Sequence, residues 1–223
     1  MNYAKSHGAI AVSNSYGGGE WSGEAGYNSV YSPGATNQVI TVSSGDSGYG
    51  VEFPAAAPGV VAVGGTSLSM SGTTRLGETA WSGAGSGCSA VESKPSNQSD
   101  PSCSRRTVAD VSADADPNTG VAVYDSYGSS GGANWYQFGG TSVASPIIAS
   151  VYALGGGGSA SNTYAARSYT VNMNDVTSGS NGRCTFSGNP HKTSSSTAAY
   201  LCTAVAGYDG PTGLGTPKGT GAF

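Results

Sequence analysis

The sequence predicts an α/β protein of three layers, in which a central, mostly parallel sheet carries helices on both faces. Three short apolar runs rich in β-branched residues, at 9–14, 38–42 and 60–63, are closed by Gly or Ser and are typical of buried parallel strands. One long apolar segment, residues 142–154, has Pro146 near its start, where proline disturbs a helix least. Strands that alternate with helical segments favour a parallel sheet.

Weaker signals complete this outline. Residues 2–7, followed by Gly8, indicate the end of a helix, because glycine is the usual left-handed stop. Residues 24–31 suit a short crossover helix, and residues 108–112 and 121–124 suit two further strands around a turn rich in Asp, Pro and Gly. Residues 155–159 (G-G-G-G-S) have the composition of a flexible loop or linker. The length of 223 residues suits a single domain over residues 1–223.

Composition excludes several classes of protein. Only 10% of residues are charged, the net charge is −4, and the nine Lys and Arg form no run, so a nucleic-acid partner is not expected. No apolar stretch approaches the ~18–20 residues that span a bilayer, so no membrane partner is expected either. The first residues do not resemble a signal peptide, and any export signal would lie upstream.

The four cysteines fall into two local pairs, Cys88 with Cys103 and Cys184 with Cys202, and neither pair has the C-x-x-C spacing of a zinc site. We predict two local disulfides, although four cysteines allow three connectivities. The alternative is four reduced thiols in a cytosolic protein.

A serine at the start of the long apolar helix is the strongest chemical signal. The segment G-G-T-S-V-A-S-P, residues 139–146, places Ser142 beside unpaired backbone N–H groups and the positive end of the helix dipole. That position suits a nucleophile whose attack builds an oxyanion, although a serine there can also serve only as a helix cap. The G-x-S-x-G turn of α/β-hydrolases is excluded because Ala144 replaces its last glycine.

No residue of the sequence is an obvious general base for this serine. The two histidines are His7, which closes the first helix, and His191, in the Ser-rich tail, and both are expected to be ordinary solvated side chains. Glu20 and Glu24 are four residues apart but follow the Tyr16-Gly17-Gly18 segment, and we expect them to be surface carboxylates.

A second motif, S-S-G-D-S-G-Y at residues 43–49, follows directly on a predicted strand. Alone, its Asp46 would be interpreted as an aspartate of a tight turn. Together with the serine motif, however, it resembles the sedolisins, the serine-carboxyl peptidases of the subtilisin-like fold. The matching segments run in the same order over nearly the whole chain: residues 13–18, 43–49, 53–66, 78–82, 106–110 and 139–146. Two departures, Ala109 in place of Pro and Gly139 in place of Ser, leave the reacting groups unchanged.

The resemblance implies roles for the motif residues. Ser142 would be the nucleophile and Asp46 the oxyanion-hole residue, while Ser15, Tyr16 and Gly17 would pair with substrate as an added strand. An aspartate donates a hydrogen bond only while protonated, which implies an acidic working pH.

The resemblance also implies a Ca²⁺ site at Asp175, Val176, Val205, Gly207 and Asp209, built from two carboxylates and backbone carbonyls. All-oxygen ligation suits this ion, and Val205, which replaces a glycine of the family pattern, would supply only its carbonyl. The alternative is two unrelated loop aspartates.

Two functions remain open at this point. The first is a secreted, calcium-dependent acid endopeptidase acting on peptide or protein substrates. The sedolisin catalytic Glu and Asp lie upstream of the first matched segment, so this chain would be the C-terminal part of the catalytic domain, and an N-terminal segment or propeptide would be its partner. The second is a non-catalytic binding or structural protein that reuses the fold. The upstream reading frame would distinguish them, because only the peptidase needs a Glu-x-x-x-Asp helix there.

Overall fold

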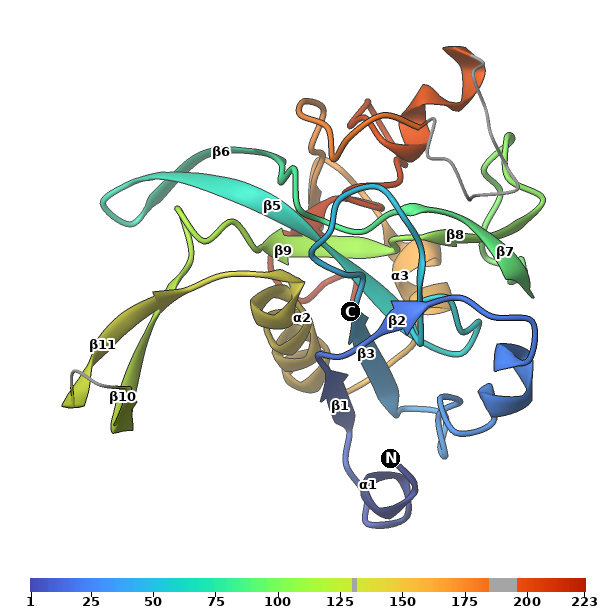
Figure 1. Ribbon diagram of the computed structural model, residues 1–223, viewed down its shortest axis with the longest axis horizontal. Coiled ribbons are helices and arrows are strands. Elements are labelled where there is room, and N and C mark those ends of the chain that lie inside the picture. The colour runs from blue at the N-terminus through green and yellow to red at the C-terminus, as the bar shows by residue number, and fades with distance from the viewer. Residues whose placement is uncertain (130–131, 185–195) are drawn as a thin grey trace.

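The computed structural model describes residues 1–129, 132–184 and 196–223 (Figure 1). Its centre is a five-stranded sheet in which β5 pairs along its length with β3, β9 and β6, and β3 pairs in turn with β1. All of these pairings are parallel except that of β5 with β6. The strands are β1 (Ala11–Asn14), β3 (Val39–Ser43), β5 (Val61–Ser71), β6 (Thr74–Ala80) and β9 (Val111–Asp114).

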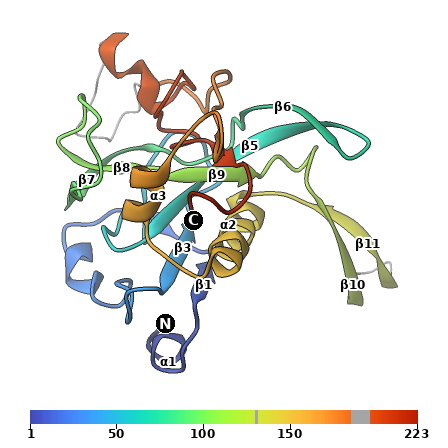
Figure 2. The same ribbon diagram turned by 180° about the vertical axis from the view of Figure 1, so that it is seen from behind.

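Helix α2 (Thr141–Gly155) covers one face of this sheet and crosses β1, β3, β5 and β9 (Figures 1 and 2). Its buried Ile148 and Tyr152 pack with Val39 and Val63 of the sheet, and Tyr164 of α3 (Ala160–Ala166) joins the same cluster. Side chains that alternate along a strand point to opposite faces, so Ile40 and Val42 serve a second cluster. On that face the covering residues come from loop segments around Phe53 and Val60.

The remaining elements are short or lie outside the central sheet. The hairpin of β10 and β11 extends away from the body of the protein (Figure 1). These elements are α1 (Asn2–Ser6), β2 (Gly18–Gly19), the 3-10 helix η1 (Glu24–Tyr27), β4 (Glu52–Phe53), β7 (Gly87–Ser93), β8 (Arg105–Val108), β10 (Val121–Ser129), β11 (Gly132–Phe138), β12 (Met173–Asn174), the 3-10 helix η2 (Ser196–Leu201) and β13 (Thr216–Pro217).

The predicted α/β class with a central, mostly parallel sheet, its first three strands and the long helix are confirmed, although α2 and α3 pack on the same face of the sheet and segments around Phe53 and Val60 cover the other. The segment 108–112, predicted as one strand, is divided instead between β8 and β9. The division follows from hydrogen bonding, because the Ala109 N–H donates to Gly210 and the Asp110 N–H donates to Ala62 at the sheet. Residues 121–124 begin a strand of the outer hairpin, and residues 24–31 form only the 3-10 turn η1, whose four residues include Gly26.

The glycine run at 155–159 is not a flexible linker. Gly155 ends α2, and Gly156, with φ of 96°, forms its left-handed cap. The Gly157 N–H donates to the Tyr152 carbonyl at 2.8 Å. A Cβ at Gly157 would lie 1.9 Å from the Asn37 carbonyl oxygen, so close packing against the neighbouring loop requires glycine here.

Both predicted disulfides are present. Cys88–Cys103 and Cys184–Cys202 have Cα–Cα distances of 5.6 and 5.5 Å, within the usual range. The first links β7 to the segment before β8, and the second links Cys184 to the residue after η2. Separately, none of the helices in the described ranges has the length and apolarity needed to cross a bilayer.

Candidate active site

Ser142 is exposed and lies one residue after the start of α2, beside Asp46 in the loop that follows β3. The Asp46 Oδ1 atom accepts hydrogen bonds from the Thr141 N–H and from the Thr141 hydroxyl, both at 2.7 Å. The chain can approach this closely because residue 140 is glycine, with φ of 89°. A Cβ on Gly140 would lie 2.7 Å from Asp46 Oδ2. Asp46 thus caps the helix directly before the predicted nucleophile.

Buried hydroxyl groups fix the start of α2 against the sheet. The Ser145 hydroxyl bonds to Ser13 of β1 and to Thr41 of β3, each at 3.0 Å. Thr41 donates in turn to the Ser145 carbonyl at 3.1 Å. Ser145 and Thr41 have no exposed surface, so the orientation of Ser142 depends on a rigid, fully hydrogen-bonded support.

The three residues predicted to bind substrate lie immediately beyond β1, next to Ser142. The Ser15 hydroxyl donates to the Ser142 carbonyl at 3.2 Å, and Tyr16 is exposed. After them, β2 pairs with β4 in antiparallel register, Gly18 opposite Phe53. Strand β1 of the central sheet therefore places the backbone of Ser15, Tyr16 and Gly17 near Ser142.

Sequence reasoning missed Glu52, which lies against this site. A Cβ on Gly17 would be 2.8 Å from Glu52 Oε2, and one on Gly45 would be 2.9 Å from Glu52 Oε1. Burial raises the pKa of Glu52, and the nearby Asp46 charge raises it further. The available signal was a single charged residue within the apolar segment 51–63.

A general base for Ser142 is not found in the described ranges of the chain, where no hydrogen bond to its hydroxyl is formed. His7 is exposed at the C-cap of α1 and stacks on Tyr3, with ring centroids 3.8 Å apart. His191 lies outside the described residues. The Ser142 N–H likewise has no partner in the described ranges and remains available to an incoming oxygen.

The expectation that Glu20 and Glu24 are surface carboxylates is wrong. Glu24 is fully buried, and Glu20 is half-buried and accepts hydrogen bonds from the Ser89 hydroxyl and the Ala90 N–H of β7. The cause is long-range packing, because β7 folds over the loop that carries both residues.

The structure brings the two aspartates of the predicted Ca²⁺ site together. The Gly207 N–H donates to both Asp175 oxygens, at 3.2 and 3.1 Å. Asp209 is fully buried and accepts from the Val205 N–H at 3.0 Å and from Thr212. Burial raises the pKa of Asp209 to about 7, with a smaller contribution from the Asp175 charge, although hydrogen bonds from Thr212 and Val205 oppose the shift.

The donor set of these loops is compatible with a hard cation. The carbonyls of Val176, Val205 and Gly207 accept no hydrogen bond from the described residues. Over the same ranges, no three His, Cys, Asp or Glu side chains form a metal-ligand group, so any ion here depends on two carboxylates plus carbonyls and water.

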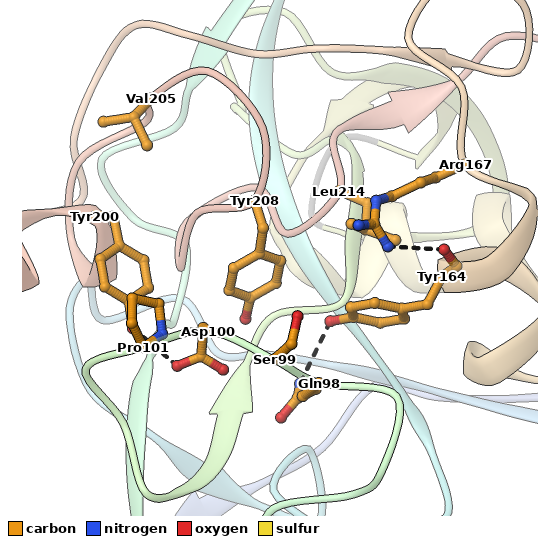
Figure 3. A pocket seen from close by; sticks show the side chains of 10 residues that line it. All are labelled: Gln98, Ser99, Asp100, Pro101, Tyr164, Arg167, Tyr200, Val205, Tyr208 and Leu214. Atoms are coloured by element: carbon orange, nitrogen blue, oxygen red, sulfur yellow. Dashed lines mark hydrogen bonds between the residues drawn. The ribbon is translucent and has the colours of Figure 1, made fainter.

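A cavity of about 350 Å³ adjoins the Asp209 loop on its other side and includes Val205 and Tyr208 but no residue of the serine site (Figure 3). The tyrosine hydroxyls around it are used within the protein. Tyr200 donates to Asp100 at 2.8 Å, Tyr208 to the Ala109 carbonyl at 3.0 Å and Tyr164 to Asp110 at 3.2 Å. We assign no ligand to this cavity.

A parallel sheet with a serine at the start of a buried helix, and a carboxyl group capping that helix, defines a protein of the subtilisin-like class. The comparisons agree: the profile of the subtilase family matches residues 1–168, and the chain belongs to that family. Within it, the relatives are sedolisin-type serine peptidases. Sedolisin from Pseudomonas sp. (strain 101) is 35% identical over 217 residues, and xanthomonalisin from Xanthomonas sp. (strain T-22) is 33% identical over 213 residues.

Solved structures give the same result. Pseudomonas sedolisin, complexed with two molecules of pseudo-iodotyrostatin, superposes with a TM-score of 0.77 at 31% identity and covers 97% of this chain. Sphericase, at 18% identity and a TM-score of 0.53, shares the fold. The alignments cover 82% and 83% of this chain but only 34% of sedolisin and 23% of xanthomonalisin, and the match covers 65% of the solved sedolisin chain.

Proposed function

We propose that this chain carries the nucleophile and the oxyanion site of a secreted, calcium-stabilised serine-carboxyl endopeptidase that cleaves peptide bonds at acid pH. The observation that carries the proposal is the position of Asp46. Its carboxyl group caps α2 through Thr141, one residue before Ser142. Thr141 thus links this carboxyl group to the residue next to the proposed nucleophile, which supports a shared role for Asp46 and Ser142 at one substrate carbonyl.

In the proposed reaction, the Ser142 Oγ bonds to the carbon of the scissile carbonyl and its proton passes to a general base. The carbonyl oxygen becomes an oxyanion. Asp46 Oδ1 already accepts both Thr141 donors, which leaves Oδ2 to carry a proton and donate it in a hydrogen bond to that oxyanion. The Ser142 N–H is a second donor to the same oxygen. Collapse of the intermediate then expels the amine, which takes the proton from the base, and leaves the acyl group on Ser142 Oγ. Water that gives a proton to the same base attacks this ester, and the carboxylic acid leaves as Ser142 Oγ takes the proton back.

Peptide substrate would lie along Ser15, Tyr16 and Gly17 as an added strand. Their proximity to Ser142, through the bond from Ser15 to the Ser142 carbonyl, supports this placement. Peptide recognition through backbone hydrogen bonds requires an unobstructed strand, and Gly17 adds no side chain to it.

Calcium would be held by Asp175, Asp209 and the carbonyls of Val176, Val205 and Gly207. When bound, the ion would neutralise the two carboxylates and join the two loops that carry them. Its role would be structural, since these loops are separate from Ser142.

A second candidate function is non-catalytic peptide binding, which is compatible with a Ser142 hydroxyl that has no hydrogen-bond acceptor among the described residues. The peptidase requires a carboxylate base and its orienting partner, which we place in an upstream segment, by analogy with the sedolisin relatives. A positioned base contributes ~10²–10⁴-fold, so the present residues alone would hydrolyse peptides weakly. Both candidates share the strand-binding segment and differ only in the reaction.

The test is peptide hydrolysis between about pH 3 and pH 8, a range that begins below the ordinary pKa of an aspartate side chain. Three proteins are compared: this chain, the chain extended upstream through a Glu-x-x-x-Asp helix, and the extended protein with Ser142→Ala. We expect weak activity from the first, acid activity that falls as pH rises from the second, and none from the third.

Binding of pseudo-iodotyrostatin, the ligand of the solved sedolisin, separates the candidates further. The peptidase predicts binding that weakens in Ser142→Ala and in Asp46→Ala. Full-rate cleavage by this chain that survives Ser142→Ala would contradict the assigned nucleophile, whereas peptide binding without cleavage by the extended protein would establish the non-catalytic function.

A further inference from the structure

Three carboxyl groups meet where the loop after β1 packs on the β7 strand. Glu20 and Glu24 belong to the loop, and Glu92 belongs to β7. Glu20 is fixed to β7 by the Ser89 hydroxyl and by the Ala90 N–H, the latter at 2.9 Å. Glu24 lies near enough to interact with both Glu20 and Glu92. Three acidic groups thus share one small region.

This cluster lies inside the protein and is incompletely hydrogen-bonded. Glu24 and Glu92 have 0% and 2% of their surface exposed. One oxygen of Glu24 accepts from the Trp21 N–H at 2.8 Å, and one oxygen of Glu92 accepts from Asn28 Nδ2 at 2.7 Å. The other oxygen of each carboxyl group, Oε1, has no hydrogen-bond donor. Buried groups left this way carry a large desolvation cost.

The basic side chains on and beside β7 and β8 bind other partners than Glu20, Glu24 and Glu92. Lys94, just after β7, pairs with Asp100 at 2.7 Å. On β8, Arg105 donates to the Val91 carbonyl at 2.6 Å, and Arg106 pairs with Asp110. In the described ranges, therefore, no ion pair compensates Glu20, Glu24 or Glu92, and three ionised carboxylates would repel one another here.

A proton resolves this repulsion. The carboxyl groups of Glu20 and Glu24 are within hydrogen-bonding contact, and two carboxyl groups can bond to each other only if one of them carries a proton. Glu20 already serves as the acceptor for two donors, the Ser89 hydroxyl and the Ala90 N–H. The complete burial of Glu24, whose Oε1 atom lacks a donor, favours the neutral form of that group.

We propose that Glu20 and Glu24 share one proton as a carboxyl–carboxylate pair, and that this pair fastens the loop of residues 18–27 onto β7 at acid pH and loosens it as pH rises. Glu92 strengthens the dependence, because its charge repels an ionised Glu24. The loop continues directly from Ser15, Tyr16 and Gly17, so its loosening would disturb that segment. The inference itself concerns the packing of the loop and stands whether or not the protein is a peptidase.

The direction of the pH effect follows from Glu24. Burial, followed by the Glu20 and Glu92 charges, raises the pKa of Glu24 from 4.5 to about 7, although the Trp21 N–H bond opposes the shift. A group with a raised folded-state pKa contributes stability that is complete below its unfolded value and is lost as pH rises through the folded one. Stability from this pair should therefore be complete below about pH 4.5 and lost by about pH 8.

The test compares melting temperatures of the protein and its Glu24→Gln variant at pH 4.5 and pH 8. Glutamine keeps the shape and donates to Glu20 at every pH. We expect closely similar values at pH 4.5 and, at pH 8, a variant more stable by about 2–4 °C, the shift that about 1 kcal/mol gives in a domain of this size. In the matched control Asp116→Asn, partial burial is outweighed by hydrogen bonds from Ser67 and Asn118, which hold the pKa of the replaced carboxyl group below its ordinary value, so its effect on the melting temperature should be the same at the two pH values.

A second measurement follows the group directly. In protein with ¹³C-labelled glutamate carboxyl groups, one resonance should titrate near pH 7, disappear in Glu24→Gln and move to lower pH in Glu92→Gln. A stability difference between protein and variant that stays constant from pH 4.5 to pH 8 would overturn the proposal. So would a gain in melting temperature with added Ca²⁺ or Mg²⁺ at pH 8 that Glu24→Gln abolishes, because a cation would then replace the proton.

Discussion

Asp110 and Glu24 are both almost completely buried, with 1% and 0% of their surface exposed, yet their surroundings differ in kind. Asp110 forms a two-point ion pair with Arg106, at 2.5 and 2.7 Å, and accepts the Ala62 N–H as well. Glu24 faces two other carboxyl groups and one backbone N–H. The same type of side chain is thus buried once with its counter-charge and once without.

The pH sensitivity of this protein arises where a buried carboxyl group lacks a counter-charge. Burial alone would lower the pKa of Arg106, but the adjacent Asp110 carboxylate raises it above its ordinary value, so the guanidinium keeps its charge. Near Glu24 the compensation must come from a proton, whose supply depends on pH. We therefore expect the packing around Arg106 to be independent of pH. The packing around Glu24, in contrast, should be firm at acid pH and looser at higher pH.

The largest expected effect comes from breaking the buried ion pair of Arg106 and Asp110. Asp110→Ala leaves the Arg106 guanidinium buried without its partner and should lower the free energy of unfolding by about 3–5 kcal/mol. The loss should be the same at pH 5 and pH 8, because the unpaired Arg106 guanidinium keeps its charge at both. Urea unfolding followed by circular dichroism measures it. A double variant, Arg106→Met with Asp110→Leu, should recover most of the loss, and a single variant as stable as the parent would contradict the importance of the pair.

The pair formed by Asp175 and Asp209 lies between the cases of Asp110 and Glu24. Its counter-charge would come from a bound Ca²⁺ ion rather than from arginine or a proton. If Ca²⁺ binds there, the native state gains about 2.7 kcal/mol when the free ion is at 100 times its dissociation constant. Excess chelator should remove this gain and lower the melting temperature, while Asp209→Asn should melt at the same temperature with and without chelator. An unchanged melting temperature of the parent protein in chelator would contradict the proposal that Ca²⁺ binds at Asp175 and Asp209.

Much of this arrangement was predictable from the sequence because local patterns determine it. The run V-I-T-V-S forms β3 with both faces buried, and the apolar segment after Thr141 forms α2. The motif around Ser142 and the loop around Asp46 come together because parallel strands and the following helix place their ends at one edge of the sheet. Periodicity and turn residues carry that information.

The burial of Glu24 could not be predicted in this way. Its neighbours Gly23 and Ala25 give no apolar signal, and the strand that covers it, β7, begins more than 60 positions later in the chain. Glu52 was missed for a similar reason, since its contacts with Gly17 and Gly45 come from two other segments. Contacts that join distant segments leave no periodic pattern in either one.

The smallest expected effect is at the active site, where Glu52 lies near Asp46 much as Glu20 lies near Glu24. Under the proposed mechanism, the negative charge of Glu52 favours the neutral, donating form of Asp46. In the extended, active protein, Glu52→Gln should therefore shift the loss of activity to lower pH by on the order of 0.5 unit, the effect of an interaction of about 0.7 kcal/mol between partly solvated charges. The measurement is the pH profile of kcat/KM, with Asp125→Asn as the control that should leave the profile in place. Burial raises the pKa of Glu52 itself, so its charge develops later as pH rises, and the profile of the parent should fall less steeply than that of the variant. An unchanged midpoint in Glu52→Gln, or a shift to higher pH, would show that Glu52 does not act on Asp46.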